Sequence, residues 1–255
     1  MNSRVDKFLL EERNGRAHCD GVVLGDGTVI RARKAVVCNA PLWNMARLLG
    51  DSVTDNQSTK VRESVAAIQS QAKEMEMTGS FMHLHLGIPK DGLPEDLDCH
   101  HSVLNFDEPI TAEQNMVIIS IPTVFDPDLA PEGYHVVHAY TAACDNYDDW
   151  EPYTDNDEES SGRSTTRYSG NSEYRKLKDD KAEVLWKAVE RVIPDVRERA
   201  ARKGSVYMVG SPLTHRRYNR RYRGTYGPAP SEGKDVWSLP GCKTRIEGLL
   251  ACGTS

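Results

Sequence analysis

Residues 81–141 contain four short runs rich in apolar and aromatic side chains, and this segment constrains the fold more than any other. The runs cover residues 81–86, 101–106, 116–121 and 134–141, and the segments between them are rich in proline, glycine and aspartate. These residue types favour turns, which let consecutive strands pair as antiparallel neighbours. The sequence therefore predicts a largely antiparallel sheet in the middle of the chain.

The first 32 residues predict a smaller antiparallel ribbon. Residues 5–11, 17–24 and 28–32 alternate apolar and polar side chains, as half-buried strands do. The last two runs are separated by a Gly-Asp-Gly sequence at residues 25–27, where glycine permits the positive φ of a tight turn. We expect a three-stranded meander here.

A strand followed by a helix is predicted next. Residues 35–38 (Ala-Val-Val-Cys) are a continuous apolar run, typical of a strand buried on both faces of a parallel sheet. Pro41 and Gly50 stand at the two ends of a predicted helix over residues 42–49. A strand, a polar turn and a helix start in this order often face a ligand.

Residues 145–160 hold eight acidic side chains and no basic one. The Ser/Gly/Arg/Thr stretch that follows adds little apolar surface, so this region lacks the means to stabilise a packed structure. We therefore expect a mobile acidic insertion over residues 145–173.

The C-terminal part predicts one long helix and two strands. Apolar residues at helical spacing indicate an amphipathic helix over residues 176–193, with a break near Pro194. Residues 205–209 and 249–252 are apolar runs of strand length. The sequence as a whole therefore predicts a mixed α/β chain.

Charge and composition exclude some functions. The 255 residues carry 32 basic and 38 acidic side chains, a formal net charge of −6, which is not typical of a general nucleic-acid binder. Residues 215–223 (HRRYNRRYR) are locally basic, and their arginines suit phosphate, carboxylate or anionic lipid. The longest nearly uncharged apolar stretch, residues 115–125, is about half the 20 residues of a transmembrane helix. We expect no nucleic-acid partner and no membrane-spanning helix.

Histidines are frequent on the predicted strands. The candidates are His83 and His85 on one strand face, His100 and His101 after Cys99, and His135 and His138 on a further strand. Imidazole is a common metal ligand, but half-buried polar side chains in a sheet explain the same pattern. The sequence contains no helix-borne His-x-x-x-His and no Cys-x-x-Cys pair. We therefore assign no metal site from the sequence.

A dinucleotide cradle is also missing, since the chain contains no Gly-x-Gly-x-x-Gly and no Walker loop. The sequence Gly224-Thr225-Tyr226-Gly227 carries two glycines that let a backbone approach a flat ligand closely, and Tyr226 can pack against such a ligand. A simple turn accounts for the same four residues.

Several segments, taken in order, resemble the carotenoid cis-trans isomerases known as prolycopene isomerases, within the FAD-dependent phytoene desaturase and amine oxidase superfamily. The matching segments are residues 21–49, 98–101 (DCHH), 120–123 (SIPT), 129–133 (LAPEG), 211–217 (SPLTHRR) and 224–228 (GTYGP). The resemblance covers nearly the whole chain apart from residues 146–172. Each motif is unspecific alone, and their common order carries the resemblance.

The resemblance implies a domain division. Residues 1–50 would form part of a Rossmann-type FAD-binding domain, and residues 51–245 a substrate-binding domain with a mixed, largely antiparallel sheet and helices. Residues 246–255 would begin a returning strand of the FAD domain. In the family the dinucleotide fingerprint lies upstream of this segment and the sequence continues beyond it, so we expect a C-terminal fragment.

The resemblance also implies the site residues. The expected FAD contacts are Asn39, Ala40, Pro41 and Gly253 at the strand ends and Gly224, Thr225, Tyr226 and Gly227 on the substrate side. Thr214, His215 and Arg216 are expected to line the substrate region. No catalytic acid or base is assigned, and Thr254 stands where the family typically has an aspartate.

The implied function is the conversion of a poly-cis carotenoid of the prolycopene type to the all-trans form through reduced FAD. A carotenoid has no ionisable group, so the chemistry follows from the cofactor. The expected partner is this hydrophobic polyene, with peripheral membrane association. The expected location is a plastid membrane or stroma in a eukaryote, or the membrane of a photosynthetic bacterium.

Three alternatives remain open. The first is a related FAD-dependent carotenoid desaturase or retinol-saturase-like oxidoreductase, which changes the mass of the product where an isomerase does not. The second is a non-catalytic fragment, and we expect the 255 residues alone to be inactive. The third is an anion- or nucleic-acid-binding module built on the Arg/Tyr segment.

Overall fold

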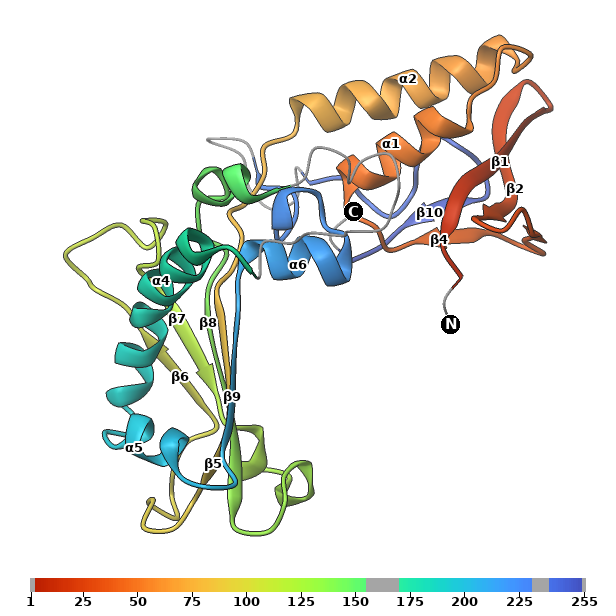
Figure 1. Ribbon diagram of the computed structural model, residues 1–255. Helices are drawn as coiled ribbons and strands as arrows, with labels where there is room; N and C mark the ends of the chain where they lie inside the picture. Colours follow the sequence, from red (N-terminus) through yellow and green to blue (C-terminus); the bar gives the residue numbers. More distant parts are fainter. Residues whose placement is uncertain (1–2, 155–169, 231–238, 254–255) are drawn as a thin grey trace. The chain divides into compact units, whose positions relative to one another are not determined.

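The computed structural model describes residues 3–154, 170–230 and 239–253, and Figure 1 shows the path of the chain. The chain divides into two compact units, which we describe separately. Unit 1 comprises Met1–Thr78 and Tyr226–Ser255, and unit 2 comprises Gly79–Thr225. The domain boundaries expected from the sequence lie at residues 50 and 245 and differ from the bounds of these units. In the described residues no helix combines the length and apolar composition that crossing a membrane requires.

Unit 1 contains two small sheets and two helices. Its elements are β1 (Val5–Arg13), β2 (Arg16–Leu24), β3 (Val29–Arg31), β4 (Val36–Cys38), α1 (Leu42–Ser52), α2 (Thr59–Glu74) and β10 (Leu249–Ala251). The antiparallel order β1-β2-β3 is the predicted ribbon, with its tight turn closed by Leu24 N–H donating to the Thr28 carbonyl at 2.8 Å. β4 and β10 pair in parallel, as the apolar run at residues 35–38 indicated.

Two local expectations for unit 1 were wrong. β4 is not buried on both faces, because Val36 and Cys38 pack towards the core while Val37 points the opposite way and is 60% exposed. The first helix does not end at Gly50 but continues to Ser52. The Ser52 hydroxyl donates to the Leu48 carbonyl at 2.5 Å and accepts the Phe8 N–H at 2.8 Å, which joins the last helical turn to β1.

Helix α2 was not predicted from the sequence. Ser58 caps it by accepting the Val61 N–H at 3.3 Å, and the apolar stripe of Val61, Val65, Ile68 and Ala72 is buried. The stripe has the spacing of one helix face, so the signal was present in the sequence. In unit 1 this stripe joins the buried face of α1 in a common core.

Unit 2 is a five-stranded antiparallel sheet with helices. Its strands are β5 (His83–Pro89), β6 (His100–Val103), β7 (Val117–Ser120), β8 (Tyr134–Thr141) and β9 (Val206–Gly210), in the order β6-β7-β8-β5-β9. Its helices are α4 (Ser172–Glu190), α5 (Val196–Ala201) and α6 (Pro212–Asn219), with 3-10 turns at Pro122–Val124, Pro127–Leu129, Asp148–Tyr153 and Tyr222–Gly224. The predicted mixed α/β class, with a largely antiparallel sheet, is confirmed.

Each strand of this sheet presents two different faces. On β5 the side chains of Leu84, Leu86 and Ile88 are buried in the core under α4, which runs along one side of the sheet (Figure 1). The alternate side chains, beginning with His83 and His85, lie on the opposite face and are half-buried. We call this opposite side the open face of the sheet.

The acidic segment is not a mobile insertion over the part that the structure describes. Asp145 accepts the Met82 N–H at 3.0 Å and the Gln114 side-chain amide at 2.7 Å, and Trp150 is fully buried. The few apolar side chains of the segment point inwards while most acids remain at the surface, so composition alone was misleading. Residues 155–169 lie outside the described residues, and α4 begins at Ser172, with Asn171 as its cap.

Candidate functional site

The carboxyl ends of β4 and β10 lie side by side in unit 1. The Cys252 N–H donates to the Cys38 carbonyl at 3.0 Å, and Asn39 and Gly253 are the next residues along their segments. Gly253 has a φ of +69°, and a Cβ at this position would lie 2.2 Å from the Asn39 Oδ1. Ligands of open α/β sheets bind beyond the carboxyl ends of parallel strands. The structure therefore brings two of the predicted cofactor residues together at such an edge.

The other predicted residues at this edge lead into α1. Ala40 packs against the core of unit 1, and Pro41 stands at the N-cap position of the helix with its carbonyl accepting the Met45 N–H at 2.9 Å. Thr254 lies outside the described residues. The contiguous segment from Asn39 to Pro41 thus joins the strand end to the helix start, as the sequence predicted.

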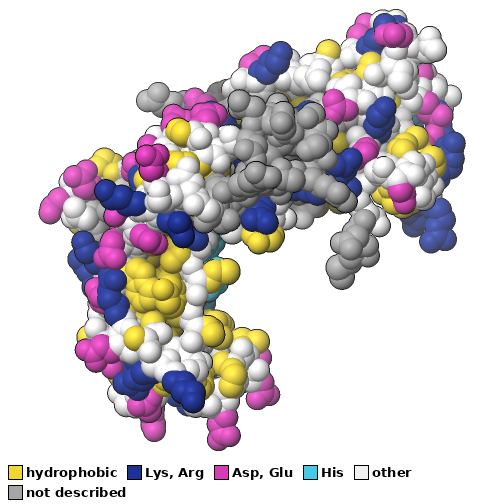
Figure 2. All heavy atoms as spheres, in the orientation of Figure 1, with side chains coloured by type: hydrophobic (Ala, Val, Ile, Leu, Met, Phe, Trp, Pro, Cys, Tyr) yellow, Lys and Arg dark blue, Asp and Glu magenta, His cyan; other side chains and the backbone are white. Residues whose placement is uncertain are grey.

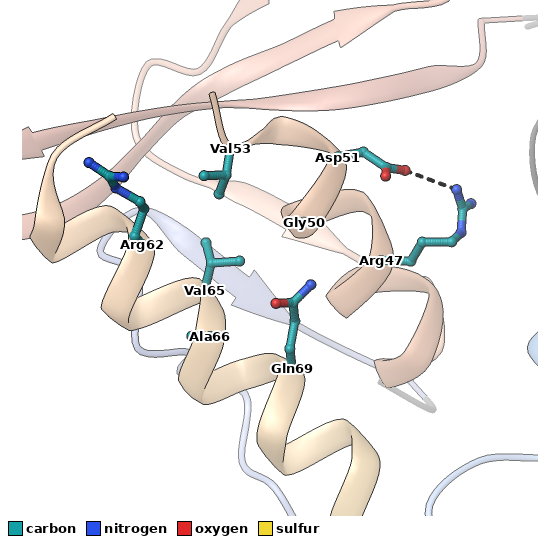
Figure 3. A pocket seen from close by; sticks show the side chains of 8 residues that line it. All are labelled: Arg47, Gly50, Asp51, Val53, Arg62, Val65, Ala66 and Gln69. Atoms are coloured by element: carbon teal, nitrogen blue, oxygen red, sulfur yellow. Dashed lines mark hydrogen bonds and ion pairs between the residues drawn. The ribbon is translucent and has the colours of Figure 1, made fainter. Parts of the chain in front are cut away.

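A groove of about 460 Å³ lies between α1 and α2 (Figure 3). Its lining residues are Arg47, Gly50, Asp51, Val53, Arg62, Val65, Ala66 and Gln69. Arg47 and Asp51 pair across one turn of α1 at 3.1 Å. None of the lining residues belongs to the predicted cofactor or substrate residues.

The four residues of the Gly-Thr-Tyr-Gly motif are divided between the two units. In unit 2 the Gly224 carbonyl accepts the Ser80 hydroxyl at 2.7 Å, and a Cβ on Gly224 would lie 2.7 Å from both this hydroxyl and the Pro212 carbonyl. Thr225 is buried beside it. The lack of a side chain at Gly224 is thus already required by packing inside unit 2.

In unit 1 the same motif continues with Tyr226 and Gly227. The Gly227 N–H donates to the Thr78 hydroxyl at 3.1 Å, and the Thr78 N–H donates to the Gly227 carbonyl at 3.0 Å. Tyr226 is 53% exposed. Of the four residues, Tyr226 is therefore the one whose side chain presents substantial surface to a ligand.

The predicted substrate residues lie on α6 and have different surroundings. Thr214 belongs to a capping box, in which its hydroxyl accepts the Ser211 N–H at 3.1 Å. Arg216 donates to the Tyr147 hydroxyl at 2.7 Å. His215 instead packs against His83, with 4.5 Å between their ring centroids. Of the three, His215 is the residue placed against the open face of the sheet.

The basic segment of residues 215–223 partly neutralises the acidic one. Arg223 pairs with Asp148 and lies 3.6 Å from a Glu151 carboxylate oxygen, and its guanidinium stacks 5.2 Å from the Tyr147 ring centroid. Arg216 binds the same tyrosine, Arg221 donates to the Thr225 carbonyl at 3.0 Å, and the Arg217 guanidinium lies 5.3 Å from the Tyr218 ring centroid.

Six rings meet on the open face of the sheet, and we call them the ring cluster. Its members are Phe81, His83, His85, His138, Tyr140 and His215. The strand register explains the arrangement, because His83 lies opposite Tyr140 and His85 lies opposite His138. The His85 and His138 rings are parallel, with 4.3 Å between centroids. Histidine side chains reach the surface of unit 2 beside hydrophobic ones (Figure 2).

The imidazoles of the ring cluster are neutral at pH 7. Burial lowers the pKa of His83 to about 2, helped by the neighbouring imidazoles. Burial likewise lowers the pKa of His138 to about 4 and that of His215 to about 4, and it lowers the pKa of His85. The ring cluster is therefore an uncharged aromatic surface.

Two of these imidazoles are bonded to each other. The Nδ1 of His83 and the Nε2 of His138 are 2.7 Å apart, a hydrogen bond in which one ring donates and the other accepts. The other nitrogen of His83, Nε2, is buried and has no hydrogen-bond partner among the described residues.

The remaining candidate histidines do not join the ring cluster. His135 is one of the residues on the other side of β8, where its Nδ1 is hydrogen-bonded to the Thr123 hydroxyl at 2.8 Å. His100 and His101 lie on β6, at the far edge of the sheet. The two-residue period of a strand separates His135 from His138, so this part could have been read from the sequence. Phe81 and Tyr140 were missed.

No family model matches the chain. A chloroplastic prolycopene isomerase of Daucus carota is 33% identical, over 99% of this chain and 36% of its own length. The chloroplastic prolycopene isomerase of Arabidopsis thaliana is 31% identical, over 92% of this chain and 35% of its own length. The chain thus spans about a third of the length of the curated relatives it matches.

Among solved structures, an oxidoreductase from Methanosarcina mazei aligns over 99% of this chain and 43% of its own, with 16% identity and a TM-score of 0.43. A reduced UDP-galactopyranose mutase aligns over 48% of this chain and 23% of its own, with 15% identity and a TM-score of 0.32. Neither reaches a TM-score of 0.5. The sequence identities and the ordered motifs agree, and the chain is a relative of the prolycopene isomerases over the segment that it shares with them.

Proposed function

We propose that this chain supplies the polyene-binding surface and part of the flavin site of an FAD-dependent isomerase, which converts a poly-cis carotenoid of the prolycopene type to the all-trans form. The observation that carries the proposal is the ring cluster. It joins six rings on one face of the sheet, and its imidazoles are uncharged at pH 7.

A polyene hydrocarbon offers a binding site neither charge nor hydrogen-bonding groups. Its affinity comes from the removal of apolar surface from water and from contact with flat rings. A neutral imidazole provides such contact, whereas an imidazolium would have to lose its hydration. The depressed pKa values in the ring cluster therefore suit a carotenoid.

The apolar surface continues from the ring cluster onto β9. Met208 lies opposite His85 and Val206 lies opposite Gly87, so both share the open face, and their side chains are 58% and 68% exposed. Gly87 has no side chain, and a Cβ there would lie 3.0 Å from the Val206 Cγ2, so the Val206 side chain packs over this glycine. The open face thus extends along the strands, in the direction that a long linear ligand requires.

The strand ends of unit 1 suit a flavin contact. Asn39 offers an amide side chain, and the missing side chain of Gly253 leaves the space that the Asn39 Oδ1 occupies at the strand ends. In the proposed enzyme Asn39, Ala40, Pro41 and Gly253 hold FAD from the strand ends, and Tyr226 packs against its ring. When bound, reduced FAD supplies reversible electron or proton transfer that lets a double bond rotate without net oxidation.

We also propose a plastid location, because the relatives carry chloroplastic in their names. Peripheral membrane contact belongs to the same proposal, since the carotenoid is insoluble in water.

The decisive experiment is product analysis with the protein that contains this chain, FAD, a reductant and prolycopene under anaerobic conditions. We expect all-trans product of unchanged mass. A product that has lost or gained two hydrogens overturns the isomerase and identifies a desaturase or a saturase.

A charge-insertion variant tests the role of the ring cluster. His85→Glu places a carboxylate on the open face and is expected to abolish carotenoid turnover while the flavin content stays unchanged. Lys203→Glu, at an exposed position before β9, is the matched control and is expected to keep turnover. Equal turnover in both folded variants contradicts a polyene-binding role for the ring cluster.

A further inference from the structure

Three histidines of the ring cluster bring ring nitrogens close together. One ring nitrogen from each of His83, His85 and His138 can be chosen so that all three atoms lie within 4.8 Å of one another. A zinc–imidazole bond is about 2.1 Å, so two ligand nitrogens on one ion are at most about 4.2 Å apart. The three rings are stacked nearly parallel, so coordination requires their side chains to rotate until the nitrogens face one ion.

All three side chains are in the form that binds a metal. Coordination requires the lone pair of a neutral imidazole, and an imidazolium must first lose a proton. Burial and the neighbouring imidazoles hold the pKa of His83 and of His138 far below 7. An incoming cation therefore has no charged ligand to deprotonate.

The hydrogen bond between His83 and His138 occupies the position that an ion would take. With Nδ1 of His83 as donor, an ion that binds this atom and the His138 Nε2 replaces the shared proton. The proton moves to Nε2 of His83, so the ring stays neutral and no proton is lost. This Nε2 is the buried nitrogen without a partner among the described residues, and the change of tautomer turns it into a donor.

The donor set indicates the class of ion. Three imidazoles suit Zn²⁺, Cu²⁺, Fe²⁺ or Ni²⁺, whereas Ca²⁺ and Mg²⁺ require oxygen ligands. Three protein ligands leave a fourth position for water or another molecule. The nearest further rings are those of His215, 4.5 Å from the His83 centroid, and Tyr140, 5.0 Å from the His138 centroid.

We propose that His83, His85 and His138 form a binding site for one divalent transition-metal ion on the open face of the unit 2 sheet. The inference goes beyond the proposed isomerase and depends on neither flavin nor carotenoid. It uses three of the six rings assigned to the polyene, so the ion and the polyene are expected to compete for the ring cluster.

The test is calorimetric titration of the metal-stripped protein with ZnCl₂, in a Cys242→Ser/Cys252→Ser background that removes the two exposed thiols. Titration with Co²⁺ adds a spectroscopic readout, because its visible absorption reports the ligand geometry. We expect one ion per chain. His138→Ala removes a ligand and is expected to weaken binding by more than the roughly 10–100-fold that loss of a hydrogen-bond partner behind a ligand costs.

Two further variants keep the test decisive. His85→Phe retains a flat ring but no ligand atom, so it also loses the ion if the site is real, and circular dichroism verifies its fold. His100→Ala, at an exposed histidine on β6, is the matched control and should bind normally. Absence of stoichiometric binding, or equal affinity in folded His85→Phe and the parent protein, overturns the site.

Discussion

The indole of Trp150 packs edge-on against the phenol of Tyr174, with 5.8 Å between the ring centroids. Trp150 belongs to the acidic segment and Tyr174 to the first turn of α4. The Tyr174 hydroxyl is in turn hydrogen-bonded to the Ser211 hydroxyl at 2.9 Å, just before α6. A segment of high charge therefore contributes a buried aromatic anchor that connects two helices.

Removal of this anchor should destabilise the protein strongly. We expect Trp150→Ala to lower the free energy of unfolding by about 3–5 kcal/mol, because a fully buried indole leaves a cavity. Urea denaturation followed by circular dichroism measures it. Asp149→Ala, which removes a surface ion pair with Lys181, should cost no more than about 1 kcal/mol. Similar small losses in both variants would show that the segment is not anchored.

The buried carboxylate of Asp145 gives a second prediction. It accepts hydrogen bonds from the Met82 N–H, the Gln114 amide and the Thr141 hydroxyl. Asp145→Asn places an amide NH₂ among these donors, and we expect a loss of about 1–3 kcal/mol in thermal or urea unfolding. Asp148→Asn, at an exposed position of the same segment, removes a surface ion pair with Arg223 and is the control, with an expected loss of no more than about 1 kcal/mol. An unchanged midpoint in Asp145→Asn contradicts these contacts.

The ring cluster predicts a loss of stability in acid. In the folded protein the pKa of His83 is about 2 and those of His138 and His215 are about 4, below the ordinary value of 6.5. Between about pH 6.5 and 4 the unfolded chain binds protons that the folded chain does not, so the free energy of unfolding decreases as pH falls. Each imidazole adds a slope of at most about 1.4 kcal/mol per pH unit, reduced by its partial exposure to solvent.

Urea denaturation at pH 7, 6, 5 and 4.5 measures this slope. His138→Phe removes one titrating group and keeps a ring, so its stability should fall less steeply with acidification than that of the parent protein. A parallel pH dependence in the two proteins would contradict a depressed pKa at His138.

The contact between Asn39 and Gly253 predicts that a side chain at residue 253 is not tolerated. Both Gly253 and Gly27 have a positive φ, which is strained for alanine. In Gly253→Ala the new Cβ would also meet the Asn39 side chain, whereas in Gly27→Ala it would have no atom within 4 Å. The φ alone costs about 1–2 kcal/mol. We expect Gly253→Ala to be the more destabilising of the two. Adding Asn39→Ala to Gly253→Ala should remove this extra loss of stability, because the side chain that the new Cβ meets is gone. Equal unfolding midpoints for the two single variants would contradict the contact.

The sequence predicted those helices and strands in which the apolar side chains recur at the spacing of the face that is buried. The alternation of Leu84, Leu86 and Ile88 with His83 and His85 predicted β5, and the helical spacing before Pro194 predicted α4. The capped stripe of α2 carried the same kind of signal and was overlooked. For residues 145–154 composition misled, because a few inward-facing side chains decide whether a charged segment is ordered.

For the candidate site, too, the sequence predicted one part and the tertiary structure decided the other. The sequence by itself determined the order of motifs that places the chain among the relatives of the prolycopene isomerases, and the strand period that puts His83 and His85 on one face. Only the tertiary structure decided that His138, Tyr140 and His215 meet them and that Asn39 lies against Gly253. The physical reason is that strand register and helix packing join residues more than 50 positions apart, and burial then sets their pKa values, which no local pattern encodes.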